Sequence, residues 1–145
     1  MQDTITREIT IKASQQKVYE AISSPEQIVK WFPDTIEGTL QQGDSPILGF
    51  GEFGKTQIYV EAARPYELFS YRWVPGANHY IGDVLQTPHT LVEFTITESG
   101  GVTKVVMTES GFAQLPAQLA EESFKQNSGG WDYMLGRLNK YFNAK

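Results

Sequence analysis

The chain has 145 residues, of which 40% are hydrophobic and 20% charged, the composition of an ordinary globular domain. This length predicts one domain, residues 1–145, around one hydrophobic core. Lys and Arg number 12 against 17 Asp and Glu, a net charge of -5, so neither nucleic acid nor an anionic membrane is an expected partner. There is no cysteine, which excludes disulfides, thiolate catalysis and cysteine-ligated metals.

Several features of the sequence bear on location and cofactors. The N-terminus lacks the basic-then-apolar pattern of a secretory signal, and no apolar run is long enough for a membrane span. We therefore expect a cytoplasmic protein with no membrane insertion. His79 and His89 are the only histidines and match no ligand spacing, so we expect no metal site. Phosphate loop, dinucleotide fingerprint and nucleophile elbow are all missing, so we expect no cofactor.

The N-terminal quarter of the chain changes from strand to helix. Isoleucines alternate with polar residues from Thr4 to Ile11, which predicts an opening strand. Ser14 follows as a candidate N-cap, before apolar residues at helical spacing. A second short helix is predicted over residues 26–31, with Pro33 ending it. The expected order is therefore one strand followed by two short helices.

A series of short strands comes next. Gly54-Lys55 and residues 99–101, which are Ser-Gly-Gly, are typical of tight hairpin turns and predict an antiparallel meander. The connection over residues 75–88 is longer than an ordinary hairpin loop, and loops of this kind often act as lids or binding loops. The predicted strands are residues 47–53, 57–63, 68–74, 91–97 and 103–109.

The chain ends in a long amphipathic helix. Trp131, Leu135, Leu138 and Phe142 recur at helical spacing, which predicts a helix over residues 116–143. Glycines weaken a helix, so the pair at 129–130 is expected to mark a tight passage over the sheet or a bend beside a cavity. The fold class is therefore α+β: a curved antiparallel sheet wrapped around this helix.

Several stretches carry a family resemblance. They are Ala-Ser followed by Val-Tyr-Glu-Ala-Ile within residues 13–22, Ser-Pro-Glu-Gln to Lys-Trp-Phe within 24–32, Arg-Pro-Tyr-Glu-Leu-Phe-Ser-Tyr-Arg-Trp at 64–73, and shorter matches within 101–112 and 130–141. The chain resembles the family homologous to the C-terminal domain of the activator of the Hsp90 ATPase, in the START-like (SRPBCC) helix-grip superfamily. This resemblance implies a helix-grip fold with an apolar cavity between the sheet and the last helix.

Two departures from the family pattern concern the mouth of that cavity. The Gly-Gly pair and aromatic residue that usually open the third strand are matched only loosely by residues 46–50, and the 75–88 connection is longer than usual. We expect both to reshape the entrance.

Aromatic side chains are the main candidates for lining the implied cavity. Period-two alternation places Phe69, Tyr71 and Trp73 on one strand face. Such stripes are more often plain core, and that simpler interpretation remains open. Tyr and Trp tips nevertheless need polar partners, which a small-molecule site provides. The predicted ligand-binding residues are Trp31, Phe69, Tyr71, Trp73, Phe94, Met107, Glu109, Phe112, Trp131 and Leu135.

Glu109 is the ionisable residue of most interest. If the strand register holds, it points inward with Val105 and Met107, where a carboxylate beside apolar walls could act as acid, base or ligand anchor. The commoner expectation is a carboxylate at the strand end that is solvated or paired with Lys or Arg. No catalytic residue is assigned.

Three functions remain open. The first is binding of an apolar small molecule without catalysis, which we favour. The second is an enzyme of the cyclase or hydrolase kind that uses Glu109 and cavity tyrosines. The third is action as a chaperone-ATPase cofactor through an exposed surface; the resemblance covers only the C-terminal module of the full activator, which makes this third function the weakest expectation.

Overall fold

In the part of the chain that the structure describes, one antiparallel sheet of seven strands forms the body of the protein. The computed structural model describes residues 3–75 and 80–143. Neighbouring strands pair in the order β1-β7-β6-β5-β4-β3-β2. The strands are β1 (Thr4–Ile11), β2 (Thr35–Glu37), β3 (Ile47–Gly49), β4 (Lys55–Arg64), β5 (Leu68–Trp73), β6 (Thr90–Ser99) and β7 (Val102–Ser110).

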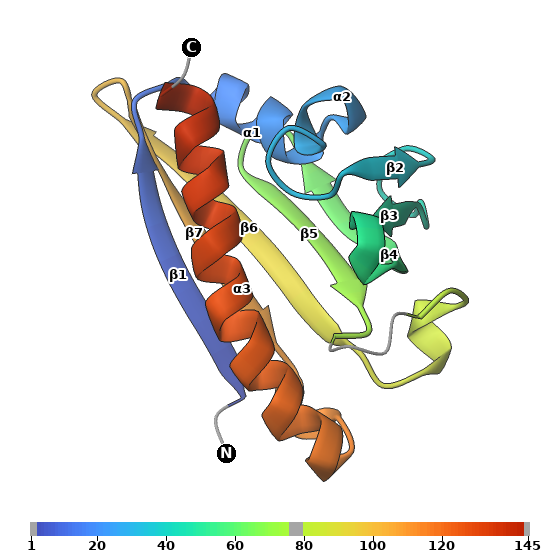
Figure 1. Cartoon of the computed structure of the whole chain (residues 1–145). Helices are drawn as coiled ribbons and strands as arrows, with labels where there is room; N and C mark the ends of the chain where they lie inside the picture. Colours follow the sequence, from blue (N-terminus) through green and yellow to red (C-terminus); the bar gives the residue numbers. More distant parts are fainter. Residues whose placement is uncertain (1–2, 76–79, 144–145) are drawn as a thin grey trace.

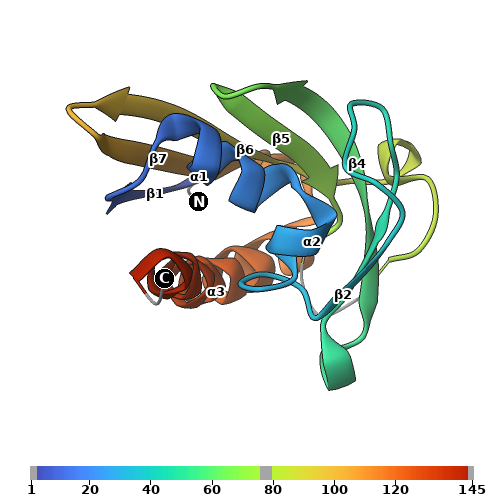
Figure 2. The same cartoon turned by 90° about the horizontal axis from the view of Figure 1, so that it is seen from above.

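The helices lie on the concave side of this sheet. α3 (Ala117–Asn143) runs along it, as Figure 1 shows, and Figure 2 shows the sheet curving around that helix. Two shorter helices, α1 (Gln15–Ser23) and α2 (Pro25–Ile28), follow β1, and three 3-10 turns complete the fold: η1 (Gly51–Phe53), η2 (Val84–Gln86) and η3 (Phe112–Gln114). This arrangement confirms the predicted α+β helix-grip fold.

The predicted helix start at Ser14 is confirmed, whereas the second helix is shorter than expected. The Ser14 hydroxyl accepts a hydrogen bond from the Lys17 amide at 3.2 Å. α2 ends at Ile28, and residues 29–31 leave the helix as a turn. That turn places the Trp31 indole in the core, where it is 0% exposed and donates to the Ala21 carbonyl at 2.9 Å.

The middle of the sheet differs from the prediction at two points. Residues 47–53 do not form one strand, because Gly51 has a φ of 62° and the chain turns there into η1. The hairpin turn predicted at Gly54-Lys55 is also misplaced, since Lys55 already pairs with Gly49 in the sheet. β2 was not predicted, and with only 3 residues it is too short to show a period.

The last hairpin and the last helix agree well with the sequence pattern. Ser99 pairs with Val102, and the two glycines between them have positive φ, as a tight turn requires. In α3 the predicted stripe is buried at Trp131, Leu135 and Leu138. Within the described ranges, no helix has the length and apolar character needed to cross a membrane.

The glycine pair in α3 does not mark a tight passage over the sheet. α3 continues through both glycines, and a Cβ atom added at Gly129 or Gly130 would meet no heavy atom within 4 Å. The expectation of a close approach is therefore wrong. Gly130 instead faces an open cavity, described next.

Candidate functional site

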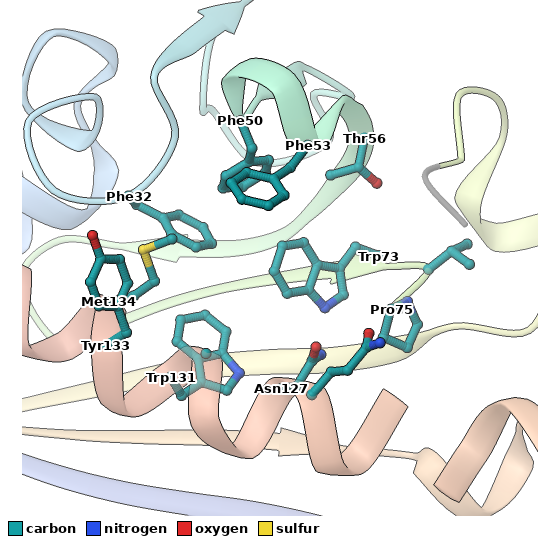
Figure 3. A pocket seen from close by; sticks show the side chains of 13 residues that line it. Phe32, Phe50, Phe53, Thr56, Trp73, Pro75, Asn127, Trp131, Tyr133 and Met134 are labelled. Carbon is teal, nitrogen blue, oxygen red and sulfur yellow. The ribbon is translucent and has the colours of Figure 1, made fainter. Parts of the chain in front are cut away.

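An open cavity of about 760 Å³ lies between α3 and the β3–β5 side of the sheet. Figure 3 shows Phe50 and Phe53 on one side of it, Trp131 and Asn127 on α3 on the other, and Trp73 between them. The lining consists of Phe32, Phe50, Phe53, Thr56, Trp73, Val74, Pro75, Gln126, Asn127, Gly130, Trp131, Tyr133 and Met134.

Side-chain periodicity in β5 and in α3 explains which residues face the cavity. Trp73 ends β5 on the inward face that it shares with Tyr71, because side chains alternate along a strand. On α3, Asn127, Trp131 and Met134 share one helical face by their spacing. These three side chains point to the same side of α3. Gly130, between them, has no side chain, and the space beside it is open, so the helix does not fill the cavity.

Aromatic rings in mutual contact form the inner wall. Phe32 stacks on Trp131 with ring centroids 5.5 Å apart and meets Phe50 edge-on at 5.4 Å. Trp73 lies 6.0 Å from Trp131 and 5.9 Å from Phe32. These pairs support one another, so the wall is preformed rather than assembled by a ligand.

Two large side chains stand at the rim of the cavity. Phe53 in η1 is 73% exposed and Tyr133 on α3 is 66% exposed. Exposed aromatic side chains are costly in water, and here both border the same opening.

The carboxylate of Glu109 lies behind this aromatic wall. Oε2 accepts hydrogen bonds from the Trp73 indole at 2.9 Å and the Thr90 hydroxyl at 2.6 Å, and Oε1 accepts one from the Trp131 indole at 2.8 Å. The Asn127 amide donates to both oxygens, at 3.0 and 3.1 Å. All of these hydrogen bonds run toward the carboxylate, which matches an ionised group that only accepts.

Glu109 therefore fixes three side chains of the cavity lining: Trp73, Asn127 and Trp131. It is 0% exposed, and inside the described ranges it forms no ion pair with Lys or Arg. The inward register is confirmed, and the commoner expectation of a solvated or cation-paired carboxylate is wrong. Neutral donors compensate this charge in place of a cation.

Two buried hydroxyls near the cavity lack hydrogen-bond partners among the residues that the structure describes. They are Oγ1 of Thr56, in the lining, and the hydroxyl of Tyr71, in the core. Burial raises the pKa of Tyr71 well above its ordinary value, and the negative charge of Glu109 raises this pKa further. Tyr71 is consequently held neutral.

The residues predicted from sequence fall into three groups. Trp73 and Trp131 line the cavity, and Glu109 lies behind them. The rest pack into the continuous core between the sheet and the helices and are not part of the lining. This last group is Trp31, Phe69, Tyr71, Phe94, Met107, Phe112 and Leu135.

Most of the lining was not predicted from the sequence. Helical spacing from Trp131 would have identified Asn127 and Met134, whereas the position of Phe53 depends on a turn that the sequence does not announce. The lining residues not predicted were Phe32, Phe50, Phe53, Thr56, Val74, Pro75, Gln126, Asn127, Gly130, Tyr133 and Met134.

The expected binding loop and the histidines can be followed only in part. Residues 76–79 of the 75–88 connection, His79 included, lie outside the described residues. His89 has its Nδ1 2.8 Å from the Thr87 carbonyl and its Nε2 3.3 Å from the Arg72 guanidinium. In residues 3–75 and 80–143, no group of three or more His, Cys, Asp or Glu side chains is placed to hold a metal ion.

Comparison with known proteins identifies the family. A family model described as "Activator of Hsp90 ATPase homolog 1-like protein" matches residues 12–143. The chain belongs to this family. The resemblance found in the sequence is therefore confirmed. No curated protein matches the chain.

Solved structures share the fold of this chain. DynU16, from the dynemicin biosynthetic locus, superposes with a TM-score of 0.78 at 22% identity over 99% of this chain, which spans only 48% of DynU16. Protein MLL2253 from Mesorhizobium loti gives 0.79 at 22% identity over 98% of both chains. The Aha1 dimer from Colwellia psychrerythraea gives 0.77 at 20% identity, over 97% of this chain and 96% of that one.

Proposed function

We propose that this protein binds a flat, hydrophobic small molecule in the cavity between β5, η1 and α3, without transforming it. A volume of about 760 Å³ falls in the range of small-molecule sites, which are mostly apolar with a few placed polar groups. The lining has this composition: aromatic rings, Met134 and Pro75, with Thr56, Gln126 and Asn127 as the polar members.

The observation that carries this proposal is the buried Glu109 carboxylate behind the two indoles. An apolar core needs no such group, and burying a charge is expensive. Here the carboxylate holds Trp73, Asn127 and Trp131 in fixed orientations around an open space. A preformed wall lowers the entropic cost of binding a rigid ligand.

The same geometry argues for binding over catalysis. Every hydrogen bond of Glu109 is made to a protein group, and its side chain is closed off from the cavity. Tyr71 is buried and held neutral, so neither member of the cyclase-like or hydrolase-like alternative reaches a ligand from its present position. The fold shared with DynU16 supports a small-molecule role only by analogy.

The family name points to a second candidate, a chaperone-ATPase cofactor that acts through its surface. The exposed rings of Phe53 and Tyr133 are among the apolar groups available for such a contact. Binding of a purified Hsp90-type chaperone by the unliganded protein would favour this candidate.

A blocking substitution separates the cavity from the rest of the molecule. Gly130→Leu directs a side chain into the open space, whereas Gly129→Leu adds the same side chain outside the lining. The wild type should show tryptophan quenching and a thermal shift with neutral flat aromatics such as 2-naphthol and flavone. Gly130→Leu should lose both effects and Gly129→Leu should retain them. Equal responses from the two variants would contradict binding in this cavity.

A further inference from the structure

We propose that the ligand carries a positive charge, and that the cavity is selective for aromatic or quaternary ammonium cations. This inference rests on the proposed function and specifies the chemistry of its ligand. It starts from the charge balance around the aromatic wall.

Among the described residues, no cationic side chain lines the cavity. The carboxylate of Glu109 is hydrogen-bonded to three lining residues, Trp73, Asn127 and Trp131. The guanidinium of Arg137, a cation, lies 6.0 Å from the ring centroid of Tyr133 at the rim. A fatty acid or another anion inside the aromatic wall would therefore find no cation among the described lining residues and would be repelled by Glu109. The net charge of -5 adds to this repulsion over a longer range.

A cation in the cavity would be attracted by Glu109. Glu109 is buried, and within the described residues its hydrogen-bond donors are all neutral and it forms no ion pair, so its field extends toward the cavity. A bound organic cation would supply the missing opposite charge. It would do so through the indole rings, because the carboxylate itself is closed off from the cavity.

The two indoles are well suited to this role. Tryptophan gives the strongest cation–π attraction among aromatic side chains. Both Nε1–H groups donate to Glu109, at 2.9 Å from Trp73 and 2.8 Å from Trp131, and a charged acceptor polarises the donor and makes the ring richer in electrons. Figure 3 shows both nitrogens turned toward the side of Asn127, which leaves ring surface for the cavity.

The shape of the lining favours a cation without N–H groups. A primary ammonium needs several acceptors, whereas the described lining is mostly aromatic or apolar and offers few of them, chiefly the Thr56 hydroxyl and the side-chain amides of Gln126 and Asn127. Quaternary ammonium and heteroaromatic cations are more weakly hydrated and can be surrounded by rings. Phe32 and Phe53 extend the aromatic surface toward the rim, where the ring of Tyr133 already has the Arg137 guanidinium 6.0 Å from its centroid.

The test compares three probes that share a benzyl group: benzyltrimethylammonium, its neutral carbon isostere neopentylbenzene, and the smaller anion phenylacetate. Dissociation constants come from tryptophan quenching and calorimetry on the full chain. We expect the cation to bind about tenfold or more tightly than the neutral isostere, and the anion to bind least. Gly130→Leu should abolish binding of the cation, which excludes adsorption to the acidic surface.

Glu109→Gln tests the origin of the selectivity. It should reduce the preference for the cation over the neutral isostere by about threefold or more. Glu122→Gln removes one charge from the exposed surface of α3 and should leave the preference unchanged. If Glu109→Gln does not fold, the three-probe series and Gly130→Leu still decide the question.

The outcomes separate this inference from the proposed function. Neutral and cationic probes of equal affinity, both blocked by Gly130→Leu, would overturn the charge selectivity and support a neutral-ligand cavity. Tighter binding of phenylacetate would also overturn it. Binding of none of the probes, together with no response to neutral flat aromatics, would overturn both proposals.

Discussion

Trp73 and Trp131 come from different elements, β5 and α3, and donate to opposite oxygens of one carboxylate, that of Glu109. Their ring centroids lie 6.0 Å apart with an interplanar angle of 34°. Hydrogen bonds to Glu109 thus connect the sheet and α3 at the cavity, within a wall that is otherwise apolar. Because the carboxylate is the shared partner, the orientation of each indole depends on the other through Glu109.

The first prediction concerns the removal of that carboxylate. Glu109→Gln keeps the volume but replaces one acceptor oxygen with a donor amide, which leaves buried N–H groups unpaired. We expect a loss of about 2–3 kcal/mol in the free energy of unfolding. Urea denaturation measures it. The surface control Glu122→Gln should stay within about 0.5 kcal/mol of the wild type. A Glu109→Gln midpoint equal to that of the control would show that the hydrogen bonds contribute nothing net.

The second prediction concerns the buried hydroxyl of Tyr71. It lacks a partner in the described residues, so Tyr71→Phe removes a desolvated polar group without creating a large cavity. We expect the variant to be as stable as the wild type near neutral pH, or more stable by up to about 1 kcal/mol. A clear loss of stability in urea would reveal a polar partner of this hydroxyl.

Tyr71 also predicts how stability depends on alkaline pH. Its ordinary pKa is 10.0, and burial together with the charge of Glu109 raises the pKa in the folded state. Well below pH 10 the hydroxyl is protonated in both the folded and the unfolded state, so it causes no loss of stability. As the pH rises above this value the unfolded chain releases the proton and the folded chain does not, and stability falls until the pKa of the folded state is reached. Tyr71→Phe should show a smaller loss of stability between about pH 8 and about pH 11. Parallel curves for the two proteins would contradict it.

The elements with a clear period were predictable from the sequence. β1, β6, β7 and α3 carry long alternating or helical patterns, and the two-glycine turn between β6 and β7 has one obvious geometry. The edge of the sheet was less predictable, because β2 and β3 have only 3 residues each and η1 replaces the expected strand. Such short pieces are held by tertiary pairing and not by local pattern.

The site was predictable only in part for a related reason. Inward-pointing Glu109 followed from strand alternation, but its donors come from β5, β6 and α3, and no local pattern brings these together. A sequence stripe also does not distinguish a ring in the core from a ring at a cavity wall, so Phe69 and Trp73 received the same interpretation. What separates them is their position relative to the cavity: Trp73 lines it, whereas Phe69 lies in the core outside the lining.

The third prediction tests the buried stripe of α3. Trp131→Ala removes a side chain that is 2% exposed and contacts Phe32, Phe94 and Trp73. We expect a loss of about 3–5 kcal/mol in the free energy of unfolding. Tyr133→Ala, two positions along and 66% exposed, should change it by less than about 0.5 kcal/mol while weakening ligand binding at the rim. An unchanged denaturation midpoint for Trp131→Ala would mean that the stripe is not a stability determinant.

The fourth prediction concerns the glycines of α3, which cost helix stability and do not serve a close approach. A Cβ atom at Gly129, Gly130 or Gly136 would meet nothing within 4 Å, so alanine at each position should stabilise the protein by about 0.5–1 kcal/mol. Thermal and urea denaturation of the three single variants check this. Among them only Gly130 lines the cavity, so Gly130→Ala alone should also alter ligand affinity. If Gly130 serves to leave the cavity open, Gly130→Ala should raise stability and change ligand affinity, whereas Gly129→Ala and Gly136→Ala should raise stability alone. A destabilised Gly130→Ala would instead show that the helix approaches another part of the chain at this point.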